Sequence, residues 1–380
     1  MNSFGTVYYA YYLFFFMRQS FGFSNKQNLM LSATYGAVYT VASFFGGRIA
    51  QRIGFSRALK IGFSVMALSL LAGWHAHTAA GQVLVMCGVV VGMCFTWPTL
   101  EALVSDGETP VSLPQKIGIY NLVWAGTGAV SFFVGGTVLQ KLGFRSIFYI
   151  PALIQIAQLI LLIALERRAA AAASIPAEDA LAASFATPPD LNPRPIAKAR
   201  AFQRMAWLAN PFAYIAINTL LAFLPGIAAR FRLSAMLAGF ICSIWCFARL
   251  GTFFLLWAWT GWHYRFRWLL LAFVLLIAGF IAVLTAPSLL VLVFMQVAFG
   301  AALGLIYYSS LFYSMQTSET KGEHGGIHEA AIGLGNFAGP AIGAASIHYL
   351  PGYANSGAIG VGVMLLGGLF GLVAIQSRSR

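Results

Sequence analysis

The chain has 380 residues, of which 59% are hydrophobic and only 9% are charged, and its mean hydropathy is +0.79. Soluble domains carry about 25% charged residues, so this composition excludes an ordinary water-soluble protein. The net charge of +13 is spread between apolar runs instead of gathering on one soluble face. That pattern excludes nucleic acid as the partner and predicts the lipid bilayer in its place.

Twelve apolar runs follow one another along the chain, and most reach the length of about 20 residues that a bilayer-spanning helix needs. In chain order they cover roughly 4–17, 27–47, 58–76, 80–103, 114–139, 143–165, 205–226, 234–258, 267–285, 288–315, 324–349 and 355–376. The sequence therefore predicts an all-α integral membrane protein with twelve transmembrane helices.

A polar segment over residues 166–203 separates the first six runs from the last six. It contains Pro188 and Pro189, an alanine run and several basic residues, a composition typical of a linker. We therefore predict an N-terminal six-helix bundle over 1–165, a cytoplasmic linker over 166–203 and a C-terminal six-helix bundle over 204–380.

The basic residues are distributed unevenly between the two sides that these runs define. The side opposite the linker receives only Arg18, Lys26, Lys141, Arg145, Arg230 and Arg232. Basic loops stay in the cytoplasm during membrane insertion. We therefore expect a multi-pass protein of the cell membrane with both termini in the cytoplasm.

Two glycine-rich stretches indicate an internal duplication. One runs from Gly326 to Gly343 and reads GIHEAAIGLGNFAGPAIG; the other runs from Gly118 to Gly136 and reads GIYNLVWAGTGAVSFFVGG. Glycines on one helical face let two helices approach closely in a bilayer, and the proline bends its helix. The helix-packing residues that this pattern predicts are Gly135, Gly136, Gly335, Gly339, Pro340 and Gly343.

These repeats resemble those of the major facilitator superfamily, whose fifth-helix motif is similar to the glycine–proline stretch. A second motif of the family, between its second and third helices, resembles the pattern formed here by Gly47, Arg52, Gly54 and Arg57. The resemblance implies two six-helix bundles that rock about a central site, with these residues taking part in the conformational change. The first bundle lacks the Gly–Pro pair and has Ser131 in its place, which argues against a drug–proton antiporter.

Arg249 is the clearest charge inside a predicted span, and no acid lies near it in sequence. Charges within the bilayer are costly, so each is a candidate for function. Arg249 would hold an anionic or hydrogen-bond-accepting substrate, or pair with a mobile carboxylate. A purely structural pair on a neighbouring helix is the alternative, and the sequence does not decide whether Glu329 or Glu101 would be its partner.

Three further titratable residues are candidates for proton coupling: His328, Glu329 and Glu101. A carboxylate in a span is a plausible proton carrier, and histidine titrates near neutrality. The alternative for His328 and Glu329 is hydration near the cytoplasmic end of their helix. For Glu101 the alternative is a contact in the cytoplasmic gate.

Polar and aromatic stripes mark the expected cavity. The family resemblance implies that the first, fourth, seventh and tenth helices line it, and such stripes occur on the first, seventh and tenth. The predicted substrate-binding residues, besides Arg249, are Tyr8, Tyr12, Trp97, Asn121, Trp124, Asn210, Tyr214, Asn218, Tyr307 and Tyr308. Packing, or an aromatic belt at the membrane surface, is the alternative for each of them.

These observations predict a secondary active transporter that works by rocker-switch alternating access and is not an enzyme. We expect a monomer that moves a small organic anion or a polyhydroxylated or ring-bearing metabolite, with a proton as a candidate coupled ion. No metal ligand set or cofactor motif is found in the sequence. The alternatives are a polytopic enzyme acting on a lipid-linked substrate and a non-transporting sensor with the same fold.

Overall fold

The computed structural model describes residues 1–105, 112–173, 193–317, 321–353 and 355–378, and every regular element in these ranges is an α-helix. In the N-terminal half the helices are α1 (Asn2–Phe21), α2 (Asn25–Ile53), α3 (Phe55–His75), α4 (Ala79–Ser105), α5 (Leu113–Leu142) and α6 (Ser146–Ala173). In the C-terminal half they are α7 (Pro193–Arg230), α8 (Ala235–Cys242), α9 (Ile244–Ala258), α10 (Phe266–Thr285), α11 (Leu289–Thr317), α12 (Lys321–Tyr349) and α13 (Ser356–Arg378).

These helices confirm the predicted membrane architecture. Within the described residues, 11 helical segments are long and apolar enough to cross a bilayer. One of them, 235–258, consists of α8 and α9, which are interrupted only at Ser243. α1 supplies the twelfth segment and extends over residues 2–21 rather than 4–17.

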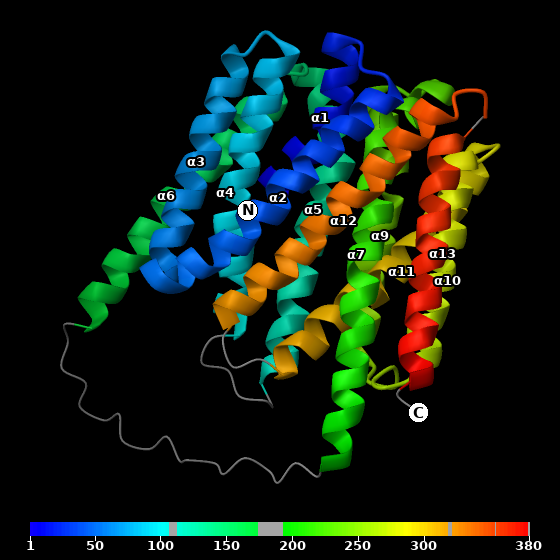
Figure 1. The fold of residues 1–380 in the computed structure, drawn as a ribbon. Helices are drawn as coiled ribbons and strands as arrows, with labels where there is room; N and C mark the ends of the chain where they lie inside the picture. The colour runs from blue at the N-terminus through cyan, green and yellow to red at the C-terminus, as the bar shows by residue number, and fades with distance from the viewer. Residues whose placement is uncertain (106–111, 174–192, 318–320, 354, 379–380) are drawn as a thin grey trace.

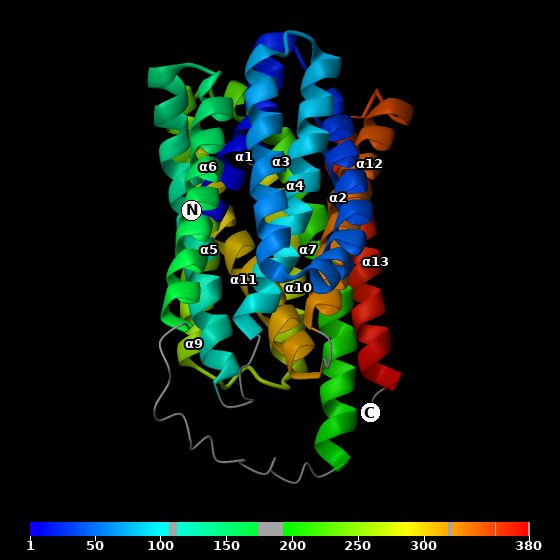
Figure 2. The same cartoon turned by 90° about the vertical axis from the view of Figure 1, so that its left-hand side faces the viewer.

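The helices form two bundles that stand side by side, α1–α6 in one and α7–α13 in the other (Figure 1). In the view turned by 90° about the vertical axis, α3 and α4 lie on the outer face of the N-terminal bundle (Figure 2). We call the lower end of the molecule in Figure 1 the basic end, because the α2–α3 connection and the C-terminal end of α13 lie there, and these segments carry Arg52, Arg57 and Arg378. We call the opposite end the acid-free end, because its connections, 21–25, 142–146 and 230–235 among them, contain no Asp or Glu.

The duplication is visible in the backbone. Positive φ angles occur at the α1–α2, α2–α3 and α5–α6 connections and again at the α7–α8, α9–α10 and α12–α13 connections, which are the corresponding places of the second half. Among the described residues, those with positive φ are Gly22, Gly54, Gly143, Arg232, Tyr264 and Asn355. The helices that follow the first of these corresponding connections, α2 and α8, begin with the same cap. The side chains of Ser24 and Ser234 each accept a hydrogen bond from the backbone N–H three residues later. The two halves therefore share turns as well as helices.

Both ends of the segment predicted as a linker are helical. α6 continues to Ala173 and α7 begins at Pro193, and residues 174–192 lie outside the described part of the chain. The alanine run after Arg168 explains the first extension, because alanine has the highest helix propensity. Hydropathy detects where an apolar run ends, whereas a helix continues as far as its propensity allows.

The two bundles meet mainly where α2 packs along α12 and where α5 packs against α8 and α9. Gly36 lies against the backbone of Asn336, and Gly136 lies against the carbonyl group of Ala235, so neither site has room for a Cβ atom. Gly47 of α2 likewise lies close to α12, at Gly326. Close backbone contact therefore joins the bundles at several levels.

The other predicted packing residues lie elsewhere. Gly135 faces the rings of Tyr8 and Tyr12 inside the N-terminal bundle, whereas Gly335 and Gly339 face α7 inside the C-terminal bundle. Gly343 has looser contacts, with Leu29 of α2 and with Val361, and Pro340 lies inside α12. Gly54 begins α3 with φ of 93°, and Arg52 and Arg57 are exposed at the basic end.

Candidate functional site

A cavity of about 120 Å³, measured as the space open to the centre of a water molecule, lies between the two bundles. Eight helices contribute to its wall: α1, α2, α4 and α5 from the N-terminal bundle, and α7, α9, α11 and α12 from the C-terminal bundle. Its polar and aromatic lining consists of Ser3, Thr6, Tyr11, Phe14, Tyr35, Tyr39, Trp97, Trp124, Tyr214, Asn218, Arg249, Tyr307, Glu329 and Asn336.

Arg249 brings a guanidinium group into this cavity from the middle of α9. Its side chain is only 4% exposed, and its Cζ atom lies 4.7 Å from the ring centre of Trp124 and 5.0 Å from that of Trp245. Trp245 precedes Arg249 by four residues, which places both on one face of the helix. The guanidinium group therefore lies against two aromatic rings, one from each bundle.

The hydrogen bonding of Arg249 is incomplete. Its buried Nε atom has no hydrogen-bond partner within the described chain, and the Tyr11 hydroxyl lies near the guanidinium group. No carboxylate of the described residues forms an ion pair with it, which answers the question of whether Glu329 or Glu101 is its partner: neither is. A buried guanidinium group without a counter-charge can receive an anion.

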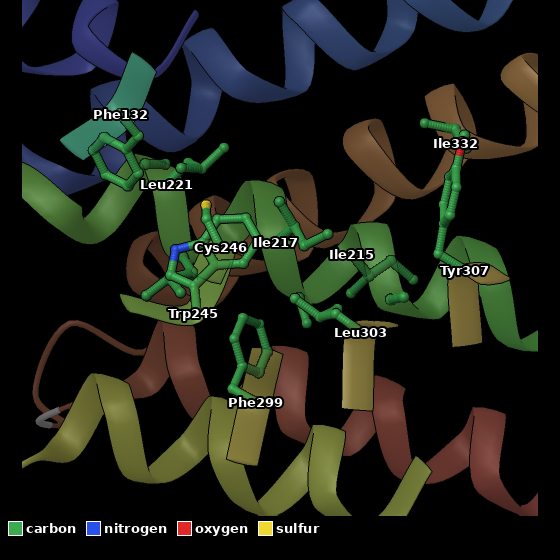
Figure 3. Packing of buried hydrophobic residues seen from close by; sticks show 14 of the residues in the cluster. Phe132, Ile215, Ile217, Leu221, Trp245, Cys246, Phe299, Leu303, Tyr307 and Ile332 are labelled. Carbon is green, nitrogen blue, oxygen red and sulfur yellow. The ribbon is translucent and has the colours of Figure 1, made fainter. Parts of the chain in front are cut away.

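The aromatic wall around Arg249 is continuous. The ring of Tyr11 stacks on Trp245 with their centres 6.2 Å apart, and Trp124 contacts both Trp97 and Tyr307 edge to face. Figure 3 shows Trp245 next to Phe299, and Tyr307 beside Ile332 farther along the same layer. Aromatic faces of this kind suit a solute with a flat ring.

A cluster of carboxyl and phenol groups closes the basic side of the cavity. Glu101 and Glu329 are 2% and 4% exposed, and their carboxyl groups are near enough to interact electrostatically. The hydroxyl of Tyr39 donates to Glu329 Oε2 at 2.6 Å, and the hydroxyl of Tyr307 donates to Glu101 Oε1 at 3.2 Å. Each carboxyl group therefore accepts a hydrogen bond from a phenol of the other bundle.

A hydroxyl group and a backbone carbonyl join the bundles on the other side of the cavity, next to an amide pair inside the C-terminal bundle. The side chain of Asn218 in α7 donates to that of Asn336 in α12, and the hydroxyl of Ser32 in α2 donates to the carbonyl oxygen of Asn218 at 3.3 Å. These groups do not titrate, so this contact does not depend on pH. The contacts between the bundles thus involve acidic groups on the basic side of the cavity and only uncharged groups on the other side.

The structure brings together seven of the predicted site residues around the cavity. Those that line it are Trp97, Trp124, Tyr214, Asn218, Arg249, Tyr307 and Glu329. Glu101 and His328 lie immediately behind Tyr307, since Glu101 accepts its hydrogen bond and the ring of His328 packs edge-on at 5.9 Å.

Five predicted substrate-binding residues do not line the cavity. Tyr8 and Tyr12 point into the N-terminal bundle, where their hydroxyls bond Ser146 and the carbonyl of Phe132. Tyr308 packs on the rings of Phe253 and Trp262. The remaining two are Asn121, which accepts a hydrogen bond from the indole of Trp124 at 3.0 Å, and Asn210, which is buried in α7.

Sequence reasoning missed several cavity residues. Tyr35 and Tyr39 lie four residues apart on α2, a spacing that could have marked them as one polar face. Asn336 was hidden inside the glycine pattern. Trp245, which lies against Arg249 but does not line the cavity, had no signal except its position four residues before Arg249.

Three comparisons place the chain among known proteins. The solved structure of the human organic anion transporter TETRAN is similar at a TM-score of 0.61 and 16% identity, covering 97% of this chain and 89% of that one. The structure of a mutant of the nucleoside transporter NupG is similar at a TM-score of 0.65 and 15% sequence identity, and the match covers 98% of both chains. The structure of a bacterial homolog of the human lysosomal transporter Spinster is similar at a TM-score of 0.65 and 15% sequence identity, and the match covers all of this chain and 93% of that one.

A search of curated proteins found no match. The family model described as Major Facilitator Superfamily matches residues 1–340, which is most of the sequence. Together with the two-bundle fold, this match confirms the resemblance noted from the motifs: the chain belongs to the Major Facilitator Superfamily.

Proposed function

We propose that this protein is a secondary transporter that carries a small organic anion with a flat ring by alternating access. The observation that carries the proposal is the buried guanidinium group of Arg249, which lies between Trp124 and Trp245 in the central cavity and forms no ion pair with an acid among the described residues. Membership of a family of transporters favours this function over the alternative of a lipid-modifying enzyme.

The chemistry of the cavity selects the class of solute. A carboxylate or phosphate would neutralise Arg249 and satisfy its unpartnered Nε atom, a charge-assisted bond that is stronger than a neutral one. The rings of Trp97, Trp124 and Tyr307 would enclose the apolar part of the solute. A polyhydroxylated neutral solute would leave the buried charge uncompensated, so we place it second.

The acid-free end supports an anionic solute independently. It carries Arg18, Lys26, Lys141, Arg145, Arg230 and Arg232, whereas none of the 10 acidic residues in the sequence belongs to it. A surface of one sign attracts ligands of the opposite sign and raises their local concentration. The similarity to solved structures of an organic anion transporter and a nucleoside transporter fits a ring-bearing, charged or polar solute.

We place the basic end in the cytoplasm of a cell, by the positive-inside rule, and treat the protein as a monomer. The two bundles would rock about the cavity so that it opens to one side at a time. The buried carboxyl groups of Glu101 and Glu329 make a proton the proposed coupled ion. A sensor that kept the fold without moving a solute is the remaining alternative, and only flux distinguishes it.

Ligand-dependent thermal stabilisation of the purified protein tests the binding part of the proposal. Aromatic carboxylates should raise the melting temperature, because a ligand that binds only the folded state stabilises it by mass action, whereas their neutral amides should not. The Arg249→Ala variant should lose this response. Arg267→Ala is the matched control, since Arg267 also lies over a tryptophan, Trp268, but outside the cavity. Equal stabilisation by acids and amides would contradict the proposal.

A further inference from the structure

We propose that a second cavity, at the acid-free end, binds a phosphate group through Arg230, Asn25 and Ser356. The phosphate group would belong to a phospholipid headgroup or to a soluble phosphate compound, since both present the same tetrahedral anion. This site is separate from the central cavity and does not depend on the solute that the central cavity carries.

The second cavity lies where the first turn of α2 meets the ends of α7, α10 and α12 and the beginning of α13. The α12–α13 connection marks its place at the acid-free end of the molecule (Figure 1). Its volume is about 280 Å³, measured in the same way as the 120 Å³ of the central cavity. No Asp or Glu of the described chain lines it, so the cavity has room for an anion and no negative charge to repel one.

Arg230, the last residue of α7, brings a positive charge to the wall of this cavity. Its Nη1 atom donates to the carbonyl oxygen of Leu284 at 3.1 Å, and its Cζ atom lies 4.8 Å from the ring centre of Phe231. These contacts hold the guanidinium group in place, and no acid of the described residues forms an ion pair with it. Because a guanidinium group has five N–H donors, the bond to Leu284 leaves donors for an anion.

Ser356 contributes a hydroxyl group at the beginning of α13. The residue is only 6% exposed, and its hydroxyl has no hydrogen-bond partner among the described residues. A buried hydroxyl without a partner is costly, and a bound acceptor would remove that cost. The N-terminus of a helix also favours a bound anion, through its dipole and its backbone N–H groups.

Asn25 supplies the third donor, from the other bundle. Its Oδ1 atom accepts a hydrogen bond from Arg18 Nη1 at 3.2 Å, and its Nδ2 atom has no acceptor within the described ranges. The amide lies directly against Gly226 of α7, where a Cβ atom would collide with it. The three donors thus come from α2, α7 and α13, and the site is complete only while α2 lies against α7.

The internal duplication shows which of these features belong to the second half alone. In the alignment that pairs the two serine caps, the residue corresponding to Ser356 is Ser146, which also begins a helix, but its hydroxyl is bonded to that of Tyr8 at 2.7 Å. The residue corresponding to Arg230 is the uncharged Ser20. The shared turns therefore require neither the unpartnered hydroxyl nor the charge, and a ligand accounts for both.

The arrangement of the donors favours phosphate over a carboxylate. Donors approach from three helices, which suits an anion with three strong acceptor oxygens better than a planar one with two. Tyr349 and Tyr353, beside the cavity, are 78% and 70% exposed, and tyrosines collect at the level of the lipid headgroups. These exposed rings favour a phospholipid as the source of the phosphate.

Thermal melting of the detergent-purified protein tests the site with defined probes. Dioctanoyl phosphatidic acid is compared with dioctanoylglycerol, which has the same acyl chains and no phosphate, and inorganic phosphate is compared with chloride at equal ionic strength. Each probe is titrated, so the rise in melting temperature gives an apparent affinity. The variants are Arg230→Gln and Ser356→Ala. Arg232→Gln is the matched control, because Arg232 is exposed at the same end and does not line the cavity.

We expect phosphatidic acid, alone or together with inorganic phosphate, to raise the melting temperature above that given by its control. Arg230→Gln should weaken the apparent affinity at least about tenfold, as loss of one charged hydrogen bond implies, and Ser356→Ala should weaken it severalfold. Arg232→Gln should respond as the parent does. A response to phosphatidic acid alone supports the site with a lipid as its ligand, and a response to both probes supports it with the phosphate group as sufficient.

No rise with phosphatidic acid and none with inorganic phosphate would overturn the site, and so would unchanged affinity in either cavity variant. A rise with inorganic phosphate alone, if it is lost in the two cavity variants, would support the site with a soluble phosphate as its ligand. Each variant is compared with itself without probe, so a loss of stability does not hide the result. If Arg230→Gln does not fold, Ser356→Ala decides.

The Arg249→Ala variant separates this site from the central cavity. It should keep its response to the phosphate probes, and loss of that response would overturn the second site, because the phosphate would then be bound at Arg249. Failure of the second site would leave anion transport standing. Absence of stabilisation by aromatic carboxylates, with the response to phosphate intact, would contradict only the proposed solute.

Discussion

Arg249 owes its position to residues on both bundles, and its geometry should matter as much as its charge. A planar guanidinium group can bind a carboxylate through two parallel hydrogen bonds while stacking on Trp124 and Trp245, whereas a lysine ammonium group cannot. We therefore expect Arg249→Lys to weaken solute affinity by at least about tenfold, the equivalent of one charged hydrogen bond. Competition binding measures the solute affinity of the variant. Unchanged affinity would show that the solute interacts with the charge of this side chain and not with the planar shape of the guanidinium group.

The left-handed turn at Gly22 offers a second test at this scale. Gly22 has φ of 68°, a region that costs residues with a Cβ atom about 1–2 kcal/mol. Gly22→Ala should lower the stability of the protein by about 1 kcal/mol, although nothing lies near the added methyl group. Gly251→Ala is the control, because that glycine lies inside α9 with open space around it and should tolerate alanine. Thermal melting compares the two variants, and equal effects would contradict the backbone explanation.

At the scale of the helix, the contact between α5 and α8 sets how closely the bundles approach. A Cβ atom at Gly136 would strike the carbonyl oxygen of Ala235, so Gly136→Ala should force the helices apart at a cost of about 1–3 kcal/mol. Gly367→Ala in α13 is the control, because no atom lies within 4 Å of its added methyl group. We expect uptake to fall only in the first variant. Normal uptake by Gly136→Ala would show that this contact does not limit closure.

The helices themselves were largely predictable, because long apolar runs in a bilayer have no alternative to helix. The ends of the helices were not predictable, because a helix can continue beyond the apolar run that marks it, as α6 and α7 do. The interruption of the eighth segment at Ser243 also left no pattern in the sequence.

The cavity was predictable only in part, for a geometric reason. A stripe at helical spacing shows that residues share a face, but it does not show which neighbour that face meets. Tyr8 and Tyr12 share a face that turns into their own bundle, whereas Tyr11 turns to the cavity. The hydrogen bond from Tyr307 to Glu101 joins helices whose bonded residues are 206 positions apart in sequence, which no local pattern can reveal.

At the scale of the whole molecule, the acid-free end should act on the rate of solute capture. Interactions between exposed charges are screened by salt, so uptake at low solute concentration should fall severalfold between about 0.02 M and about 0.3 M ionic strength. Uptake at saturating solute should change little. Lys141→Glu together with Arg232→Glu should remove most of the salt dependence, because both side chains belong to the acid-free end. Arg378→Glu at the basic end is the control and should leave it unchanged. All three side chains are exposed, so their replacement should not disturb the fold. An uptake rate independent of salt would argue against electrostatic capture.

The central claim is that the cavity moves an organic anion held by Arg249, and uptake into proteoliposomes tests it most directly. The measurement compares aromatic carboxylates with their neutral amides, in the parent protein, in Arg249→Ala and in the Arg267→Ala control. We predict uptake of at least one carboxylate by the parent and the control, no uptake of its amide, and a loss of about 100-fold in Arg249→Ala, as two charged hydrogen bonds imply. Transport of the amide at the same rate, or undiminished transport by Arg249→Ala, would contradict the claim.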